Sequence, residues 1–412
     1  MQLRLHYKEV LKYLAILWII LSSGSMYFTI MNVMINLFVF LGIGILTILV
    51  LKIDGKTLKK NLLNFGIIML IVLLNLFINS EYSVIDNDLI ILLIRLISLI
   101  MIQTTLTKVD FAVKFVKIMT LLAVVSLICF AITMAGLSLP GQIVESRNGL
   151  QYFYTFYHTV GYRTIYQRNA GIFWEAPAYA IFLNMAIVYL VTYRDMFKRK
   201  FFSRSLVILI ITVCTTLSTI AYICLGIVLI YVFLSLKKNP LINNNMMHQT
   251  EMQESSGSKR KIIIYAIVLA GIALLVYMEN RFSIISYKLI NRGASYTTRT
   301  NDTYMSVLLA MRRPFFGYGV FNDYSVYILQ TMGVVNNSSG LGAMLVAWGI
   351  PVTILYFIKS LRGISEQLGK GAIRSLLILA LMLIFHSSEH LWLYTFFMTF
   401  LLSWKESKRE AI

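Results

Sequence analysis

The sequence contains few of the residues that form disulfides, bind metals or break helices. Only three cysteines, five histidines and five prolines occur among 412 residues. Cys129, Cys214 and Cys224 all lie inside apolar runs, so we expect no disulfide framework. His386 and His390 are four residues apart but have too few further ligands nearby, so we expect a polar cap at the outer end of a span there rather than a metal site. We expect no cofactor.

Acidic residues are also scarce. Asp and Glu total 18 against 37 Lys and Arg, which gives a formal net charge of +19. Such a charge is typical of nucleic-acid-binding proteins, but the chain is also 58% hydrophobic with a mean hydropathy of +0.76. This composition indicates a single polytopic membrane domain over residues 1–412. We therefore predict an all-α fold and no nucleic-acid partner.

Long apolar runs dominate the chain. A helix needs about 20 apolar residues to cross a bilayer, and twelve segments meet or approach that length. The predicted spans are 11–30, 33–51, 62–78, 89–107, 118–137, 176–193, 204–218, 220–236, 262–278, 339–358, 373–387 and 390–404. The N-terminus resembles a signal peptide but lacks a convincing cleavage site, so we expect it to be retained as the first span.

The basic residues sort between the two sides of the predicted topology. With the N-terminus inside, 27 of the 37 Lys and Arg fall in inner segments, nine in outer segments and one, Arg95, within a span. Because cytoplasmic segments carry an excess of Lys and Arg, we predict that both termini are cytoplasmic. The polar residues 237–261 then form a flexible cytoplasmic linker.

The nine outer basic residues lie in two predicted outer loops, 138–175 and 279–338. They are Arg147, Arg163, Arg168, Arg281, Lys288, Arg292, Arg299, Arg312 and Arg313. Basic residues placed against the topological bias indicate an anionic ligand at the outer face. Arg95 is costly within an apolar run, and it could line the path of that ligand, pair with a buried acid, or extend to a lipid head group.

Both outer loops show helix signals. Pro177 suits the first turn of the helix after the first loop, with Glu175 where the helix dipole favours a negative charge. In the second loop, Asn301 or Asp302 can cap a helix over 302–313. The apolar face of that helix predicts packing on the membrane surface or on the helix bundle.

Three motifs follow one another along the chain. Arg168-x-x-Gly-x-Phe-x-Glu175-x-Pro177 opens the sixth predicted span, and Leu217-Ser218-Thr219 lies in the turn between the seventh and eighth. The third motif comprises Arg299, Arg313-Pro-Phe-Phe-Gly-Tyr-Gly319, Asn336-Asn337 and Trp348-Gly-Ile-Pro351. In this order, the motifs resemble those of the bacterial O-antigen and capsule polymerase/O-antigen ligase family, which includes the Wzy-type polymerases.

The resemblance implies glycosyl transfer at the outer face of a bacterial plasma membrane, without a metal, from a polyprenyl-diphosphate-linked oligosaccharide. The implied product is O-antigen, capsule or exopolysaccharide. Besides the lipid-linked donor and membrane lipid, a chain-length regulator and a flippase are candidate partners. Family ligases carry a His-Asn pair where this chain has Asn336-Asn337, and tend to carry Arg where it has Thr219. Both departures favour a polymerase.

The residue types suggest the roles. Arginine binds phosphate oxygens in pairs and stays protonated, so we expect Arg168 and Arg299 to stabilise the diphosphate leaving group. Glu175 is the preferred acceptor of the proton from the attacking sugar hydroxyl, with Asp302 as the alternative. The further substrate-binding candidates are Arg95, Arg147, Arg163, Arg292, Arg312, Arg313 and Asn336.

Two other functions stay open. An O-antigen ligase would transfer a finished glycan to another acceptor, and a lipid-linked oligosaccharide flippase or other transporter would move its substrate across the membrane. Such a transporter is expected to show similar halves, short outer loops and charges spread through its spans. Two long basic outer loops and a single mid-span charge favour the polymerase.

Cysteine labelling tests the predicted topology. Cysteines introduced at Leu150 and Ser325 should react with a membrane-impermeant maleimide added outside intact cells, whereas one at Asn245 should react only after the cells are permeabilised. The unsubstituted protein, whose cysteines lie in predicted spans, is the control. Labelling of intact cells at position 245 alone would contradict the orientation.

Overall fold

The chain forms two compact units in the computed structural model. The first comprises Met1–Ile118 and Asn291–Ile412, and the second comprises Met119–Ile290. The structure describes residues 2–27, 32–80, 87–137, 139–146, 149–153, 157–160, 167–237, 269–273, 276–277, 280, 294–321, 324–334, 337–369 and 371–406.

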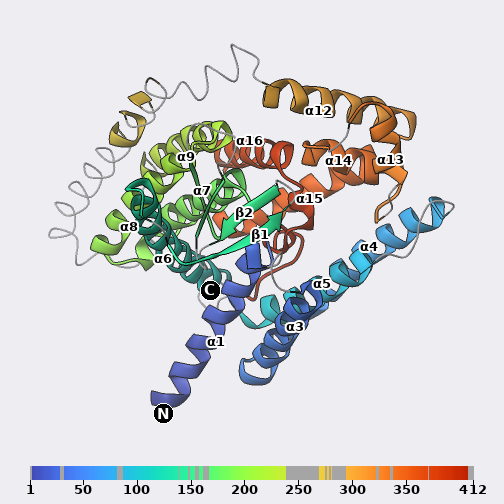
Figure 1. The fold of residues 1–412 in the computed structure, drawn as a ribbon. Coiled ribbons are helices and arrows are strands. Elements are labelled where there is room, and N and C mark those ends of the chain that lie inside the picture. Colours follow the sequence, from blue (N-terminus) through green and yellow to red (C-terminus); the bar gives the residue numbers. More distant parts are fainter. Residues whose placement is uncertain are drawn as a thin grey trace. The chain divides into compact units, whose positions relative to one another are not determined.

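Long apolar helices begin the first unit. They are α1 (Gln2–Leu21), α3 (Val33–Val50), α4 (Gly55–Ile78), α5 (Asn87–Thr105) and the start of α6 (Lys108–Met134), as labelled in Figure 1. Within the described residues, four helices are long and apolar enough to cross a membrane, namely α3, α4, α5 and α6. They coincide with four predicted spans. Further apolar helices at 176–192, 219–235 and 373–388 are shorter, and the total of twelve spans is not confirmed.

Among its described residues, the C-terminal part of the first unit contains five more helices of eight residues or longer. These are α12 (Ala294–Arg312), α13 (Tyr324–Thr331), α14 (Gly340–Trp348), α15 (Ile350–Leu368) and α16 (Ala372–Ser388). A small hydrophobic core joins α12, α13 and α14 through Leu309, Tyr318, Leu329, Val334 and Val346. This core fixes the segments that carry the third sequence motif.

The second outer loop does contain a helix, but its start and its packing face differ from the prediction. Since α12 begins at Ala294, Asp302 lies in its interior and does not cap it. The predicted apolar face is exposed, with Tyr304 at 59% and Met311 at 64%, whereas Asp302 and Ser306 are buried. Packing of that apolar face on the described bundle is therefore excluded, and contact with the membrane surface stays a prediction.

The predicted tenth span, 339–358, is not one helix. α14 ends at Trp348 and α15 begins at Ile350, with Gly349 between them at φ +79°. Glycine adopts this conformation without a steric penalty, and Pro351 suits the first turn of the new helix.

The predicted last span, 390–404, is also wrong as a continuous helix. Its described helical parts are the short η2 (Leu391–Leu393) and α17 (Thr395–Met398). Most of this segment is buried, and buried backbone groups outside a helix need partners within the protein. Ser23 Oγ accepts from the N–H of Phe396 at 2.8 Å, and Gln103 Nε2 donates to the carbonyl of Thr399 at 2.9 Å.

Asn61 and Arg95 hold the same irregular segment. Asn61 Nδ2 donates to the carbonyl of Ser403 at 2.9 Å, and its Oδ1 accepts from the N–H of Ser403 at 2.7 Å. Arg95 donates from Nη1 to the carbonyl of Leu393 at 2.6 Å. Arg95 thus donates a hydrogen bond to a backbone carbonyl, a contact that is not among the three roles predicted for it from the sequence.

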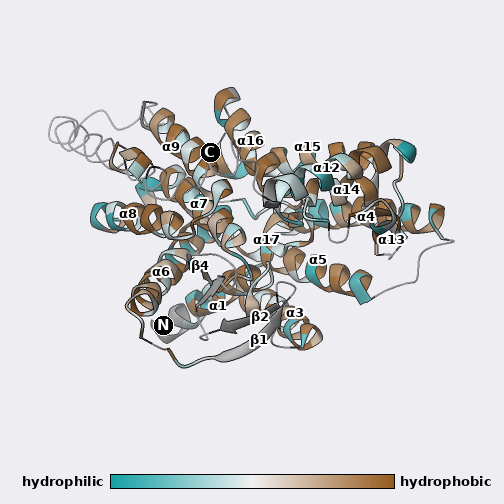
Figure 2. Ribbon diagram, turned by 45° about the horizontal axis from the view of Figure 1, so that its top comes forward, coloured by the Kyte–Doolittle hydropathy of each residue, from teal (hydrophilic) through white to brown (hydrophobic). Residues whose placement is uncertain are grey.

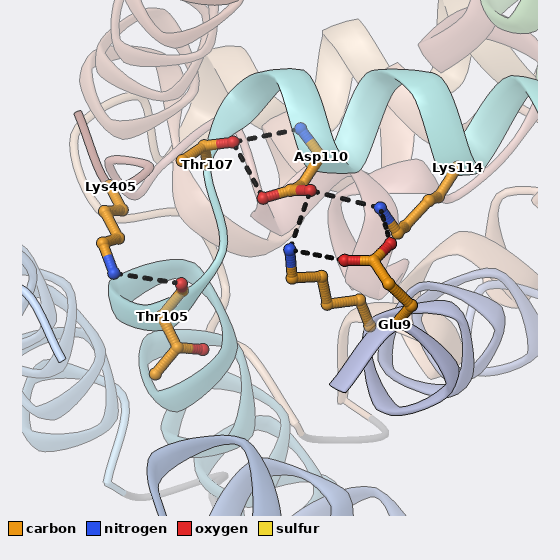
Figure 3. Close-up of polar contacts among 7 residues, drawn as sticks. Glu9, Thr105, Thr107, Asp110, Lys114 and Lys405 are labelled. Carbon is orange, nitrogen blue, oxygen red and sulfur yellow. Dashed lines mark hydrogen bonds and ion pairs between the residues drawn. The ribbon is translucent and has the colours of Figure 1, made fainter. Parts of the chain in front are cut away.

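Ion pairs of the first unit join segments predicted for the same side. Lys12 contacts Glu9 at 2.9 Å and Asp110 at 3.1 Å, and Lys114 contacts Glu9 at 3.0 Å (Figure 3). Burial raises the pKa of the Glu9 carboxyl, but hydrogen bonds from Lys12 and Lys114 outweigh this effect and hold the pKa below its usual value. Further pairs join other predicted inner segments, namely Lys56–Glu406 and Lys60–Glu366. The predicted topology requires this same-side pairing.

The second unit begins with the rest of α6, and an antiparallel sheet follows in the first predicted outer loop, where short helices were expected. Its order is β1 (Gln142–Ser146), β2 (Gly149–Phe153), β3 (His158–Val160) and β4 (Arg168–Gly171). The local sequence QYFYTFYHTV is rich in aromatic and β-branched residues, which favour strands over helices.

Helices follow the sheet in the second unit. They are α7 (Ala176–Thr192), α8 (Arg199–Thr215) and α9 (Thr219–Lys237), with the short η1 (Arg194–Met196) after α7. α7 is buried along its whole length from Ala176 to Val191 and packs against α8 and α9. A helix that is hydrophobic all round occupies a core. Figure 2 shows the apolar residues, in brown, that run along α6 and α9.

Asn61→Ala should destabilise the protein. It removes the partners of a buried N–H and a buried C=O, each worth about 1–3 kcal/mol, so thermal unfolding of the purified protein should show a lower Tm. Leu63→Ala, at a position 66% exposed on the same helix, is the matched control and should stay within about 0.5 kcal/mol of the parent. Equal Tm values for the two variants would contradict the role of Asn61.

Candidate functional site

Arg168 brings the first two sequence motifs into contact. It begins β4, and its Nε donates to the carbonyl of Thr216 at 3.2 Å. Thr216 caps the C-terminus of α8 at the tight turn of the second motif, where Leu217 has a positive φ of 45°. The first outer loop and the α8–α9 turn therefore form one local site in the second unit.

Asn169 supports the same turn from the interior. It is fully buried, and its Nδ2 donates to Thr215 Oγ1 at 3.0 Å and to Ser126 Oγ at 3.3 Å. Its Oδ1 accepts from the N–H of Gly171 at 3.0 Å. Gly171 has φ +55°, and a Cβ there would lie 2.7 Å from the ring of Tyr179. The motif glycine is therefore required for this packing.

Glu175 lies at the N-terminus of α7. It occupies the N-cap position, where its carbonyl accepts from the N–H of Tyr179 at 3.1 Å and its side chain makes no capping bond. Pro177 lies in the first turn, as predicted. Glu175 is partly buried.

The third motif forms a second local site, in the first unit. The turn 314–319 packs against residues 346–350 through backbone hydrogen bonds from Tyr318 to Val346, from Gly319 to Ala347 and from Ile350 to Pro314. A Cβ at Gly349 would lie 2.6 Å from the carbonyl oxygen of Phe315. The two glycine-containing parts of the motif thus form one backbone-bonded structure.

Asn75 of α4 braces this structure. Its Nδ2 donates to the carbonyl of Phe316 at 2.7 Å, and its Oδ1 accepts from the N–H of Val320 at 2.9 Å. One turn further along α4, Asn79 accepts a long, 3.4 Å hydrogen bond from Arg313. Asn75 was missed from the sequence. A side-chain amide inside a membrane-length apolar run is costly without hydrogen-bond partners. Its position in such a run is the sequence signal that could have identified Asn75.

Asp302 holds the segment that contains the motif asparagine. It is 3% exposed, and its Oδ2 accepts from the N–H of Ser338 at 2.9 Å and from Ser338 Oγ at 2.6 Å. Ser306, one turn further along α12, accepts from Asn337 Nδ2 at 3.0 Å. His390 Nε2 lies 3.1 Å from the carbonyl of Asn337, which requires the proton on Nε2 because a carbonyl can only accept.

Arg299 lies about one helical turn before Asp302 on α12. Its side chain is partly buried, and within the described residues its Nη1 is buried without a hydrogen-bond partner. A buried guanidinium nitrogen with no partner is costly and is well suited to an anionic group such as a phosphate.

The comparisons with known proteins bear on these two sites. Residues 205–357 match a protein-family model described as O-antigen ligase. The match supports an O-antigen polymerase/ligase-type protein. The matched range includes the α8–α9 turn, Arg299, Asp302 and the turn 314–319, whereas Arg168 and Glu175 precede it. No curated protein and no solved structure matches the chain significantly.

The match confirms the resemblance that the motifs indicated. An O-antigen polymerase/ligase-type protein is a membrane protein, as the apolar helices here also indicate. The family suggests a glycosyl-transferring enzyme in general, with a lipid-linked oligosaccharide as its substrate. It does not distinguish a polymerase from a ligase.

The other site residues predicted from the sequence lie in different surroundings. Arg312 is exposed, and the guanidinium of Arg313 lies 5.0 Å from the centre of the Tyr318 ring. Arg95 contacts backbone, as described above. Four predicted residues lie outside the described residues: Arg147, Arg163, Arg292 and Asn336. No group of three or more potential metal ligands occurs within the described part of the chain.

Proposed function

We propose that this protein is a polymerase that joins polyprenyl-diphosphate-linked repeat units at the outer face of the bacterial plasma membrane. In the reaction, the bond between the sugar and the donor's diphosphate breaks, and a bond forms to a hydroxyl oxygen of a second lipid-linked unit. The hydroxyl proton passes to a carboxylate, and the polyprenyl diphosphate leaves. The observation that carries the proposal is the buried Arg299 Nη1, which has no partner within the described residues.

The two arginines of the motifs have different surroundings. Arg299 offers an unused buried donor, whereas Arg168 already donates from Nε to the α8–α9 turn. A guanidinium has five N–H donors, so the single Nε bond to the turn does not by itself exclude a phosphate-binding role for Arg168. Preorganised donors of this kind stabilise a developing negative charge strongly where water is excluded.

The carboxylates also differ. Asp302 Oδ2 accepts two hydrogen bonds from Ser338, one from its N–H and one from its Oγ. Asp302 is therefore better suited to positioning the segment around Ser338 than to accepting a proton. Glu175 belongs to the same motif as Arg168. Because Asp302 is engaged by Ser338, we assign the general-base role to Glu175.

Ligase activity is the second candidate, and one contact favours it. His390 places an imidazole beside Asn337, although the chain lacks the histidine of the ligase His-Asn pair at position 336. The polymerase is preferred because Thr219 stands where ligases tend to carry arginine. The proposed products are O-antigen, capsule or exopolysaccharide, and the proposed partners include a chain-length regulator and a flippase.

Arg168→Ala and Arg299→Ala should each abolish polymer while the protein stays in the membrane, because each removes a donor to the diphosphate. Lysine at either position should recover little, since a point charge lacks the two-toothed geometry of arginine. Polymer length on gels and protein in membrane fractions are the readouts. Arg281→Ala and Lys288→Ala, which change outer cations away from the motifs, are the controls. Normal polymer from both lysine variants would refute paired binding of the phosphate oxygens.

Glu175→Gln and Asp302→Asn separate the base from the positioning residue. Glutamine at 175 cannot accept the proton, so polymerisation should slow by about 10²–10⁴-fold and single lipid-linked units should accumulate outside. Asparagine at 302 keeps an oxygen for both Ser338 donors, so polymer should be near normal. The opposite ranking of the two variants would transfer the base role to Asp302.

A further inference from the structure

An apolar groove lies in the first unit, and no motif arginine is among its lining residues. Its volume is about 420 Å³, within the range of sites that hold small-molecule ligands. Its walls are formed by apolar side chains of α4 and α15, among them Ile67, Ile71, Leu355 and Ile358. All of its lining residues belong to the first unit.

The groove runs along the helix axis for about half a bilayer. Its lining on α4 extends from Lys60 to Val72, which corresponds to about 18 Å at a rise of 1.5 Å per residue. The hydrocarbon core of a bilayer is about 30 Å thick. The groove is therefore long enough for a lipid chain from one leaflet.

The charges of the groove gather at one end. Lys60, Lys359 and Arg362 line it there together with a single carboxylate, Glu366. Lys60 lies 3.7 Å from Glu366, and Lys359 donates to Asn64 Oδ1 at 2.5 Å. One carboxylate against three cations leaves an excess of positive charge, and all three cations belong to segments predicted to be cytoplasmic.

The opposite end is uncharged. It is lined by residues such as Leu92, Met344, Trp348 and Trp392. At this end, the lining itself supplies no cation for the diphosphate of a donor handled at the outer face. The polarity of the groove therefore fits a lipid whose anionic group faces the cytoplasm.

We propose that this groove binds one anionic phospholipid of the cytoplasmic leaflet. The phosphate lies among Lys60, Lys359 and Arg362, and an acyl chain follows the apolar walls towards Trp348. Cations at the cytoplasmic surface attract anionic lipids, and lysine and arginine donate readily to phosphate oxygens. The proposal does not depend on glycosyl transfer, and its test reads lipid binding alone.

The test is a lipid titration of the purified full-length protein in detergent, followed through its Tm. Phosphatidylglycerol should raise the Tm at lower concentration than phosphatidylcholine with the same acyl chains, and inorganic phosphate alone should have no effect. Lys60→Gln and Arg362→Gln should each weaken phosphatidylglycerol binding about fivefold. Lys59→Gln, at the adjacent position outside the groove lining, is the matched control and should leave binding unchanged.

A second pair of variants tests the apolar walls. Ile67→Trp, within the lining, should fill the groove and weaken binding, whereas Leu70→Trp, exposed on the same helix outside the lining, should not. The Tm of each variant without lipid shows whether it is folded. Three results would overturn the proposal: equal binding of the two phospholipids, equal weakening by Lys59→Gln and Lys60→Gln, or tighter binding of a polyprenyl phosphate that Ile67→Trp abolishes.

Discussion

Backbone groups buried outside helices must find partners within the protein, and the described structure depends on this constraint. A helix satisfies its own N–H and C=O groups, but several buried segments here are irregular. Residues 389–405 are held by Asn61, Gln103 and Arg95, and the turn 314–319 is braced by Asn75. Arg168 performs the same task for the α8–α9 turn by donating to the carbonyl of Thr216. Polar side chains inside apolar helices thus act mainly as substitutes for secondary structure.

The same constraint positions the candidate sites. Each motif turn is fixed by buried hydrogen bonds: Arg168 and Asn169 hold one, and Asp302 fixes the segment next to Asn337. The backbone around the motif arginines therefore cannot easily rearrange. Donors that are fixed in advance in this way are well suited to stabilising a negative charge on a ligand. Arg299 is a motif arginine whose buried Nη1 has no hydrogen-bond partner within the described residues. That unmet hydrogen bond is the strongest local indication of an anionic ligand.

Much of the helical framework follows from composition, but the irregular parts do not. Apolar runs of membrane length predicted α3, α4, α5 and α6 because length and hydropathy suffice to define such helices. The run at 390–404 looks the same in sequence, yet it folds mostly without a helix because side chains distant in the chain bond to its backbone. Hydropathy does not record such partners.

The sequence motifs predicted the two candidate sites only in part. They identified Arg168, Glu175 and Arg299 as candidates, and the match of residues 205–357 to the O-antigen ligase family supports the resemblance. Local sequence signals also assigned Asp302 to a helix cap, because the true start of α12 lies further upstream. The contact between His390 and Asn337 joins residues 53 positions apart, a separation that no local pattern reveals.

Reconstitution is the most direct test of the central claim that the chain polymerises lipid-linked units at its outer face. The purified protein in liposomes would receive a synthetic polyprenyl-diphosphate-linked repeat unit, with a chelator present to remove divalent metal. The account predicts a ladder of lipid-linked products that grows by whole repeat units and disappears with Arg299→Ala. Movement of the single unit across the bilayer without any ladder would contradict it and indicate a transporter.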